Sequence, residues 1–79
     1  MRATVVVRPK QGILDPQGAA VVTALDHLGF GVSDARVGKV IDLEVDAADA
    51  DTARAQVEKM CAQLLANPLM ESYEVHIGG

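Results

Sequence analysis

The sequence predicts an α+β fold: a two-layer, ferredoxin-like β-α-β-β-α-β sandwich in which an antiparallel sheet carries two helices on one face. Segments with alternating apolar side chains, typical of strands, and segments with apolar side chains at helical spacing follow in the order strand, helix, strand, strand, helix, strand. The length of 79 residues, of which 49% are hydrophobic, suits one small globular domain that spans residues 1–79.

A run of three valines marks the first strand, residues 3–9. Val5 and Val7 should face the core, because successive side chains of a strand point to opposite sides. Pro9 cannot donate a ladder hydrogen bond, so we expect the strand to end there and a loop to follow at residues 10–14.

Capping residues frame the first helix. Asp15 can accept a hydrogen bond from a free backbone N–H as the N-cap, and Pro16 suits the first helical position. Gly29 supplies the left-handed conformation with which many helices end. Gly18 lies inside the helix, where glycine costs roughly 1 kcal/mol relative to alanine, so another segment should pack closely there.

The middle of the chain predicts two strands joined by a turn. Residues 32–37 are the first of them, and Gly38-Lys39 is the expected turn. Residues 40–46 alternate cleanly and should present an acidic outer face.

A second helix is expected at 47–66, with Asp49 or Asp51 as its N-cap and Asn67-Pro68 as its end. Its apolar stripe consists of Val57, Met60, Cys61, Leu64 and Leu65, extended by Ala50 and Ala53. A last strand at 69–77 should turn Glu71, Tyr73, Val75 and Ile77 to one side, before a Gly78-Gly79 tail.

Composition excludes several classes of protein. The net charge is −4, and an acidic chain with few aromatic residues is a poor nucleic-acid binder. No apolar run approaches the roughly 20 residues that span a bilayer, and none resembles a signal peptide. A single cysteine offers no internal disulfide. We therefore expect a cytoplasmic chain with no nucleic-acid or membrane partner.

No residue pattern predicts catalysis or a metal site. Cys61 shares the apolar stripe of its helix and should be a buried hydrophobic residue, and His27 and His76 lack further spaced ligands. Asp42, Glu44 and Asp46 could bind a hard cation, but a solvated acidic face explains them more simply. The chain therefore has the composition of a partner subunit or a binding module.

A thin core with one Phe, one Tyr and no Trp also points to self-association. The open face of the sheet should carry Val6 and Val40 among charged residues, and a second copy could cover it.

Four blocks of the sequence resemble the PurS family, the small subunit of phosphoribosylformylglycinamidine (FGAM) synthase. The first block matches the family signature K-x-G-hydrophobic-x-D-P-x-G. The blocks follow in the family order over essentially the whole chain: residues 10–18, Leu28-Gly29-Phe30, Arg36-Val37-Gly38-Lys39 and residues 61–73.

The resemblance implies a non-catalytic subunit of an ATP- and glutamine-dependent ligase in de novo purine biosynthesis. The complex converts formylglycinamide ribonucleotide, ATP and glutamine into FGAM, ADP, phosphate and glutamate. PurL carries the synthetase chemistry, PurQ is the glutaminase, and PurS bridges them and supports glutaminase coupling and ammonia transfer. ATP, magnesium and glutamine would thus be used by the partner subunits, with no cofactor on this chain, which is expected to form a homodimer or homotetramer.

The resemblance also separates two groups of residues. The candidates for the partner interface are Lys10, Gly38, Lys39, Asn67 and Glu71. The residues expected to shape the fold are Asp15, Pro16, Gly18, Gly29 and Pro68. On the core-facing side of its strand, the carboxylate of Glu71 would need a partner, which a subunit interface could supply.

Two other functions compete with this interpretation. One is a small-molecule-binding regulatory module of ferredoxin-like (ACT-type) shape, whose ligand would bind near the loop Lys10-Gln11-Gly12. The other is a ubiquitin-like sulfur carrier, which also ends in Gly-Gly. Those carriers open with a hairpin, whereas the first strand here runs directly into a helix, so the order of elements argues against the second alternative.

Overall fold

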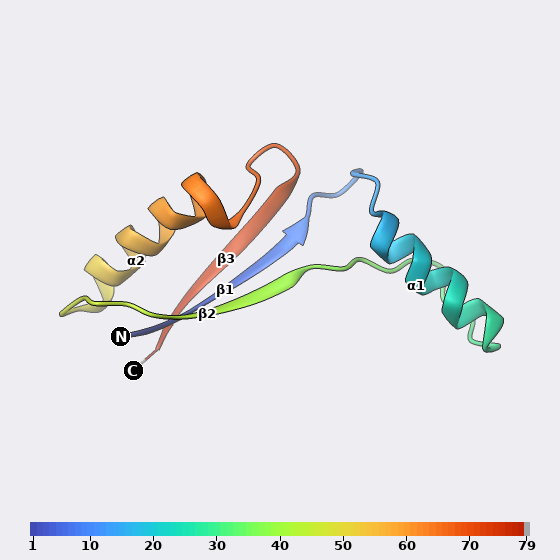
Figure 1. Ribbon diagram of the computed structural model, residues 1–79, viewed down its shortest axis with the longest axis horizontal. Coiled ribbons are helices and arrows are strands. Elements are labelled where there is room, and N and C mark those ends of the chain that lie inside the picture. The colour runs from blue at the N-terminus through green and yellow to red at the C-terminus, as the bar shows by residue number, and fades with distance from the viewer. Residues whose placement is uncertain (79) are drawn as a thin grey trace.

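The computed structural model describes residues 1–78 and contains one antiparallel sheet and two α-helices (Figure 1). The elements are β1 (Arg2–Pro9), α1 (Pro16–His27), β2 (Lys39–Glu44), α2 (Ala50–Met60), a π-helical turn η1 (Cys61–Leu65) and β3 (Glu71–Gly78). The strand order is β2-β1-β3. The α+β class and the antiparallel sheet are confirmed. Gly78 belongs to β3, and Gly79 lies outside the described residues.

The central strand β1 sets the register of the sheet. Val5 lies opposite Ile41 of β2 and Val75 of β3. Val5 and Val7 are fully buried, as predicted, and so is Ala3 on the same face of β1. On the opposite face, Val6 pairs with Val40, which is 63% exposed.

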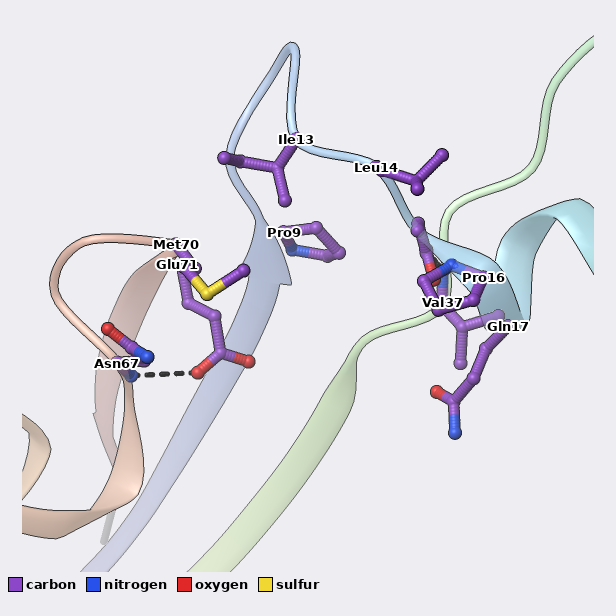
Figure 2. A pocket seen from close by; sticks show the side chains of 10 residues that line it. Pro9, Ile13, Leu14, Pro16, Gln17, Val37, Asn67, Met70 and Glu71 are labelled. Carbon is purple, nitrogen blue, oxygen red and sulfur yellow. Dashed lines mark hydrogen bonds between the residues drawn. The ribbon is translucent and has the colours of Figure 1, made fainter.

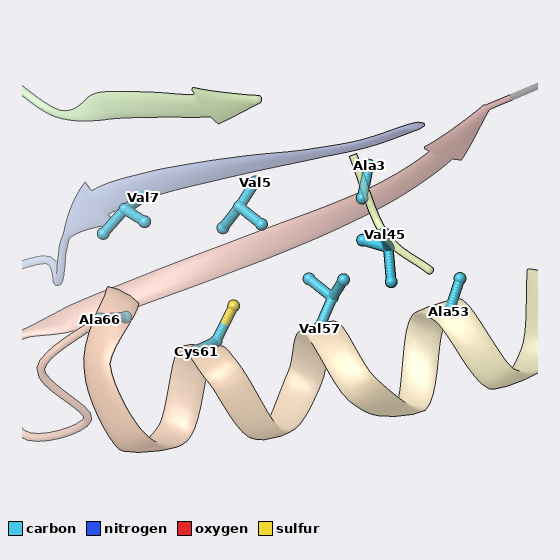
Figure 3. Close-up of a cluster of buried hydrophobic side chains, with 8 residues drawn as sticks. All are labelled: Ala3, Val5, Val7, Val45, Ala53, Val57, Cys61 and Ala66. Carbon is cyan, nitrogen blue, oxygen red and sulfur yellow. The ribbon is translucent and has the colours of Figure 1, made fainter. Parts of the chain in front are cut away.

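A single row of side chains from α2 and η1 packs against this core (Figure 3). Ala53, Val57 and Cys61 are fully buried at four-residue spacing. The wider predicted stripe is wrong at its edge, because Met60 is 37% exposed and Leu64 is 82% exposed. A single helix against a narrow sheet buries only the row that faces the strands, so these two side chains lie on its flank.

The predicted strand at residues 32–37 is not a strand in the structure. Residues 31–38 are without regular secondary structure and lead directly into β2, so the sheet of the described residues has three strands. The chain does not reverse at Gly38, whose φ lies outside the left-handed region that tight hairpin turns require. Gly38 instead allows close approach, since a Cβ there would collide with the carbonyl oxygen of Val7.

The prediction of two helices on one face of the sheet is also wrong for the single chain. Only α2 packs on the sheet, whereas α1 lies apart at the far end of a molecule that measures 50 × 26 × 14 Å (Figure 1). In α1 only Gly18 is buried. We call residues 10–38, which comprise α1 and its two connecting segments, the arm.

The predicted caps of α1 are confirmed. Asp15 is the N-cap and its Oδ1 accepts a hydrogen bond from Gly18 N at 3.0 Å, with Pro16 in the first helical position. Gly29 has a φ of 91°, and Phe30 N donates to Leu25 O at 3.0 Å, which closes the C-terminal end. Both ends of the helix are thus fixed by local chemistry.

Candidate partner-binding site

The candidate interface residues gather at one end of the sheet. Because the strands are antiparallel, the end of β1 lies beside the beginnings of both β2 and β3. Lys10 therefore follows β1 at the same end where Lys39 begins β2 and Glu71 begins β3. The arm also leaves the sheet there, and we call this region the arm end of the sheet.

A compact turn between η1 and β3 holds Asn67, Pro68 and Glu71. Asn67 N donates to Glu71 Oε1 at 2.7 Å, and Asn67 Oδ1 accepts from Leu69 N at 3.0 Å. Asn67 O accepts from Glu71 N at 2.8 Å and so closes the turn. The carboxylate of Glu71 thus has a partner within the chain, and it does not need the interface contact expected for it.

Lys10 ties the loop after β1 to this turn. Its Nζ donates to Pro68 O at 2.7 Å, and its backbone N donates to Met70 O at 2.9 Å. Lys10 is exposed, and a lysine ammonium has three donors. It can therefore hold the turn and still donate to a second group.

Arg36 fixes the other side of the arm end. Its Nη2 donates to Lys10 O at 2.6 Å and contacts Pro9 O at 3.4 Å. Arg36 lies in one of the family-like blocks, but its contact was not predicted, because an arginine that binds backbone carbonyls leaves no sequence pattern. The hydrogen bonds join the returning segment of the arm to the end of β1.

Positive charge is concentrated at the arm end, although the chain is acidic. Arg8, Lys10, Arg36 and Lys39 all lie there in a chain with only seven Lys and Arg. Arg8 forms an ion pair with Glu74 at 3.1 Å, and both side chains are more than half exposed. Lys39 has no ion pair among the described residues. Its charge is available to an acidic partner.

Two hollows flank the end of β1. One, of about 400 Å³, lies between the arm and the turn before β3, and Pro9, Ile13, Met70 and Glu71 are among its lining residues (Figure 2). The other, of about 290 Å³, is lined by Val6, Val7, Arg8, Pro9, Arg36, Gly38, Lys39 and Val40. The first is lined largely by apolar side chains, and the second carries the basic side chains of Arg8, Arg36 and Lys39.

Asp15 and Cys61 are titratable side chains whose surroundings serve the fold. Hydrogen bonds from the backbone N–H groups of Val37 and Gly18 lower the pKa of Asp15. Burial, and then the nearby Glu58, raises the pKa of the Cys61 thiol, which is fully buried as expected. Within residues 1–78 no three His, Cys, Asp or Glu side chains form a group that could hold a metal ion. No helix in that range is long and apolar enough to cross a membrane.

Comparison with known proteins decides the family. The model of the family "PurS: Phosphoribosylformylglycinamidine (FGAM) synthase" matches residues 2–79. The chain belongs to the PurS family. A PurS subunit from Synechocystis is 48% identical over 73 residues, which are 91% of this chain and 71% of the relative.

Solved PurS structures share the fold. B. subtilis PurS is 37% identical, with a TM-score of 0.88 over 99% of this chain and 98% of that one. A chain of the PurLQS structure from Thermotoga maritima is 36% identical, with a TM-score of 0.85 over 95% of this chain and 93% of that one. As a PurS protein, the chain is a small subunit of FGAM synthase, a ligase complex of purine biosynthesis.

Proposed function

We propose that this PurS chain bridges a PurL-type synthetase subunit and a PurQ-type glutaminase subunit and supports the coupling of glutamine hydrolysis to FGAM synthesis, including ammonia transfer. The observation that carries the proposal is the likeness of the whole chain to a chain of the T. maritima PurLQS structure. In this proposal ATP, magnesium and glutamine are used by the partner subunits in the cytoplasm, and the chain itself supplies binding surface.

The arm end of the sheet is the proposed contact region. Asn67 and Glu71 line one hollow, and Gly38 and Lys39 line the other. Lys10 lies beside them and binds the turn through Pro68 O. Basic side chains beside an apolar hollow suit an acidic surface with a projecting apolar side chain, because charge complementarity speeds and orients association.

Reconstitution tests the proposed role. The purified chain is mixed with its synthetase and glutaminase subunits, and FGAM formation is followed with glutamine and, separately, with ammonium salt as nitrogen source. Omission of the PurS chain should abolish most of the glutamine-dependent activity and affect the ammonia-dependent activity less. Equal glutamine-dependent activity with and without the chain would refute the bridging role.

Self-association belongs to the same proposal, as a homodimer or homotetramer. The described core is small, with Val5, Val7, Val57 and Cys61 as its largest fully buried side chains. A chain with so small a core gains stability from a second copy.

Calorimetric titration with amino acids and nucleotides tests the competing regulatory module, which requires tight binding by the isolated chain.

A further inference from the structure

The hollow between the arm and the turn before β3 has walls from two separate parts of the chain (Figure 2). Met70 and Glu71 form one wall, Pro16 and Gln17 form the other, and Pro9 lies between them. We call this space the arm hollow. Its volume of about 400 Å³ falls within the roughly 300–1,000 Å³ typical of ligand pockets, so it has room for one long side chain.

Most side chains around the arm hollow are apolar, and some of them are open to solvent. Met70 is 48% exposed and Leu14 at the rim is 84% exposed, so residues 1–78 leave this apolar surface uncovered. Covering it gains about 25 cal/mol for each Å² of apolar surface removed from water. The arm hollow therefore favours an apolar group from outside the single chain.

A carboxylate lines this apolar space. Glu71 Oε1 accepts from Asn67 N at 2.7 Å, and Figure 2 shows the other carboxylate oxygen pointing away from Asn67. Glu71 is partly buried and has no ion pair among residues 1–78. The ammonium of Lys10 donates to Pro68 O instead. A partly buried carboxylate with a free oxygen is stabilised by a cationic hydrogen-bond donor.

We propose that the arm hollow receives one arginine or lysine side chain of a partner subunit, the synthetase or the glutaminase. Its charged end donates to Glu71, and its carbon stem lies on Pro9 and Met70. Long basic side chains combine such an apolar stem with a cationic end. The amide oxygen of Gln17 on the opposite wall offers a second acceptor, which suits the forked donors of arginine. This inference rests on the proposed bridging role and adds what the partner presents.

The charges outside the arm hollow restrict the partner further. Lys10 lies at the turn, and Arg36 and Lys39 line the neighbouring hollow. These cations repel a broadly basic surface, because like charges across an interface are unfavourable. The contact therefore fits a single basic side chain that projects from an otherwise acidic or neutral surface.

Hydrogen bonds hold both walls of the arm hollow in place before a partner binds. Lys10 N donates to Met70 O at 2.9 Å, and Lys10 Nζ donates to Pro68 O at 2.7 Å, which fixes the turn. Asp15 accepts from Val37 N at 2.7 Å, which fixes the base of the arm. A site formed in advance loses less conformational entropy on binding than a flexible loop does.

A titration of FGAM synthase with the chain tests the charge of Glu71. Synthetase and glutaminase are held at fixed concentrations, and glutamine-dependent FGAM formation is measured as the chain is added. Glu71→Gln keeps an oxygen for Asn67 N but loses the charge. It should need a roughly ten-fold higher chain concentration for half-maximal activity and reach the same maximum. Glu58→Gln removes the same charge from an exposed position of α2 and should behave like the wild type. Thermal midpoints check that both variants are folded.

Photo-cross-linking identifies the occupant without relying on activity. A photoreactive benzoylphenylalanine in place of Leu14, at the exposed rim, is irradiated in a mixture of the three subunits. It should capture a segment of the synthetase or the glutaminase with an arginine or lysine beside the cross-linked residue. Replacing that residue by alanine should raise the half-maximal chain concentration as Glu71→Gln does. The double variant should be little worse than either single one, because both remove the same contact.

Three results would overturn the proposal. These are a Glu71→Gln variant that titrates like the wild type, a captured segment without a neighbouring arginine or lysine, and a cross-link that reaches only a second copy of the chain or no protein at all. Equal activity with and without the wild-type chain would instead refute the bridging role. A wild type and a Glu71→Gln variant that restore activity equally well would refute only the basic contact, and the cross-link decides the occupant of the arm hollow in either case.

Discussion

At the scale of single residues, two glycines are required by what lies against them. A Cβ on Gly18 would collide with Ala35 O, and one on Gly38 would collide with Val7 O, whereas a Cβ on Gly31 would meet nothing within 4 Å. In an open helix Gly18→Ala would stabilise by about 1 kcal/mol. Here we expect Gly18→Ala and Gly38→Ala to lower the thermal midpoint and Gly31→Ala to leave it nearly unchanged. A raised midpoint for Gly18→Ala would show that the arm can relax without cost.

Asp15 combines two roles that substitutions can separate. The amide of an Asp15→Asn variant would keep an oxygen for Gly18 N but lose the second acceptor used by Val37 N. Asp15→Asn should therefore lower the midpoint less than Asp15→Ala, for which we expect roughly 4–8 °C. Asp49→Ala, which removes the N-cap of α2 but touches no arm contact, is the matched control.

The pKa of Asp15 also gives a pH dependence. Backbone N–H donors lower this pKa in the folded state below its ordinary value of 3.8, so the carboxylate stabilises the fold above that pH. The contribution disappears as the pH falls through the lowered folded-state pKa. The difference in midpoint between wild type and Asp15→Ala should thus be full at pH 7 and shrink in acid below about pH 4. A difference that is constant down to pH 2 would mean that the charge is not involved.

Contacts of this kind were predictable from sequence only where they are local. The caps Asp15, Pro16 and Gly29 could be identified because each acts on its own helix end within a few residues. The binding of Arg36 to Lys10 O joins residues 26 positions apart and depends on the path of both arm connections. The partner of Glu71 was missed for a similar reason. Its carboxylate accepts from Asn67 N only because the chain forms a closed turn there, and the sequence pattern does not specify that turn.

At the scale of elements, α2 shows how far periodicity determines a buried face. The pattern correctly places Val57 and Cys61 in the core but cannot say how wide the opposing sheet is. We expect Val57→Ala to cost about 1.5–3 kcal/mol, because it removes methyl groups from a fully buried position. Leu64→Ala, at an 82% exposed position, should cost less than about 0.5 kcal/mol. Urea denaturation measures both free energies of unfolding. Equal losses would mean that Leu64 is packed as tightly as Val57, as the wider predicted stripe requires.

The segment at residues 32–37 shows a second limit of patterns. The sequence predicts a strand there, but residues 31–38 of the structure have no regular secondary structure. Strand-forming residues alone do not specify a neighbouring strand to pair with. A hairpin at Gly38-Lys39 was the nearest solution in sequence, but close packing of Gly38 on β1 prevents it.

At the scale of the whole molecule, Lys39 tests the contact with partner subunits. Its side chain is exposed and has no ion pair among residues 1–78, so Lys39→Ala should change stability by less than about 0.5 kcal/mol. If an acidic partner faces it, Lys39→Glu should weaken complex assembly more than Lys39→Ala, because like charges repel across an interface. Asp51→Asn, at an exposed position of α2 away from the arm end, serves as the control. Normal assembly and turnover by Lys39→Glu would mean that Lys39 is solvated and contacts no partner subunit.

Self-association of the chain predicts how the stability of the whole molecule depends on concentration. A partner that binds only the folded chain stabilises it by mass action, so the midpoint of a dimer rises with protein concentration. For the wild type we expect a rise of several degrees from about 2 to about 200 μM chain, on the order of 4–8 °C for each kcal/mol gained. Leu28 is apolar and 72% exposed in the single chain, so Leu28→Asp should reduce this rise if a second copy covers that side chain. A midpoint of the wild type that is independent of concentration would mean that the three-stranded chain is stable alone.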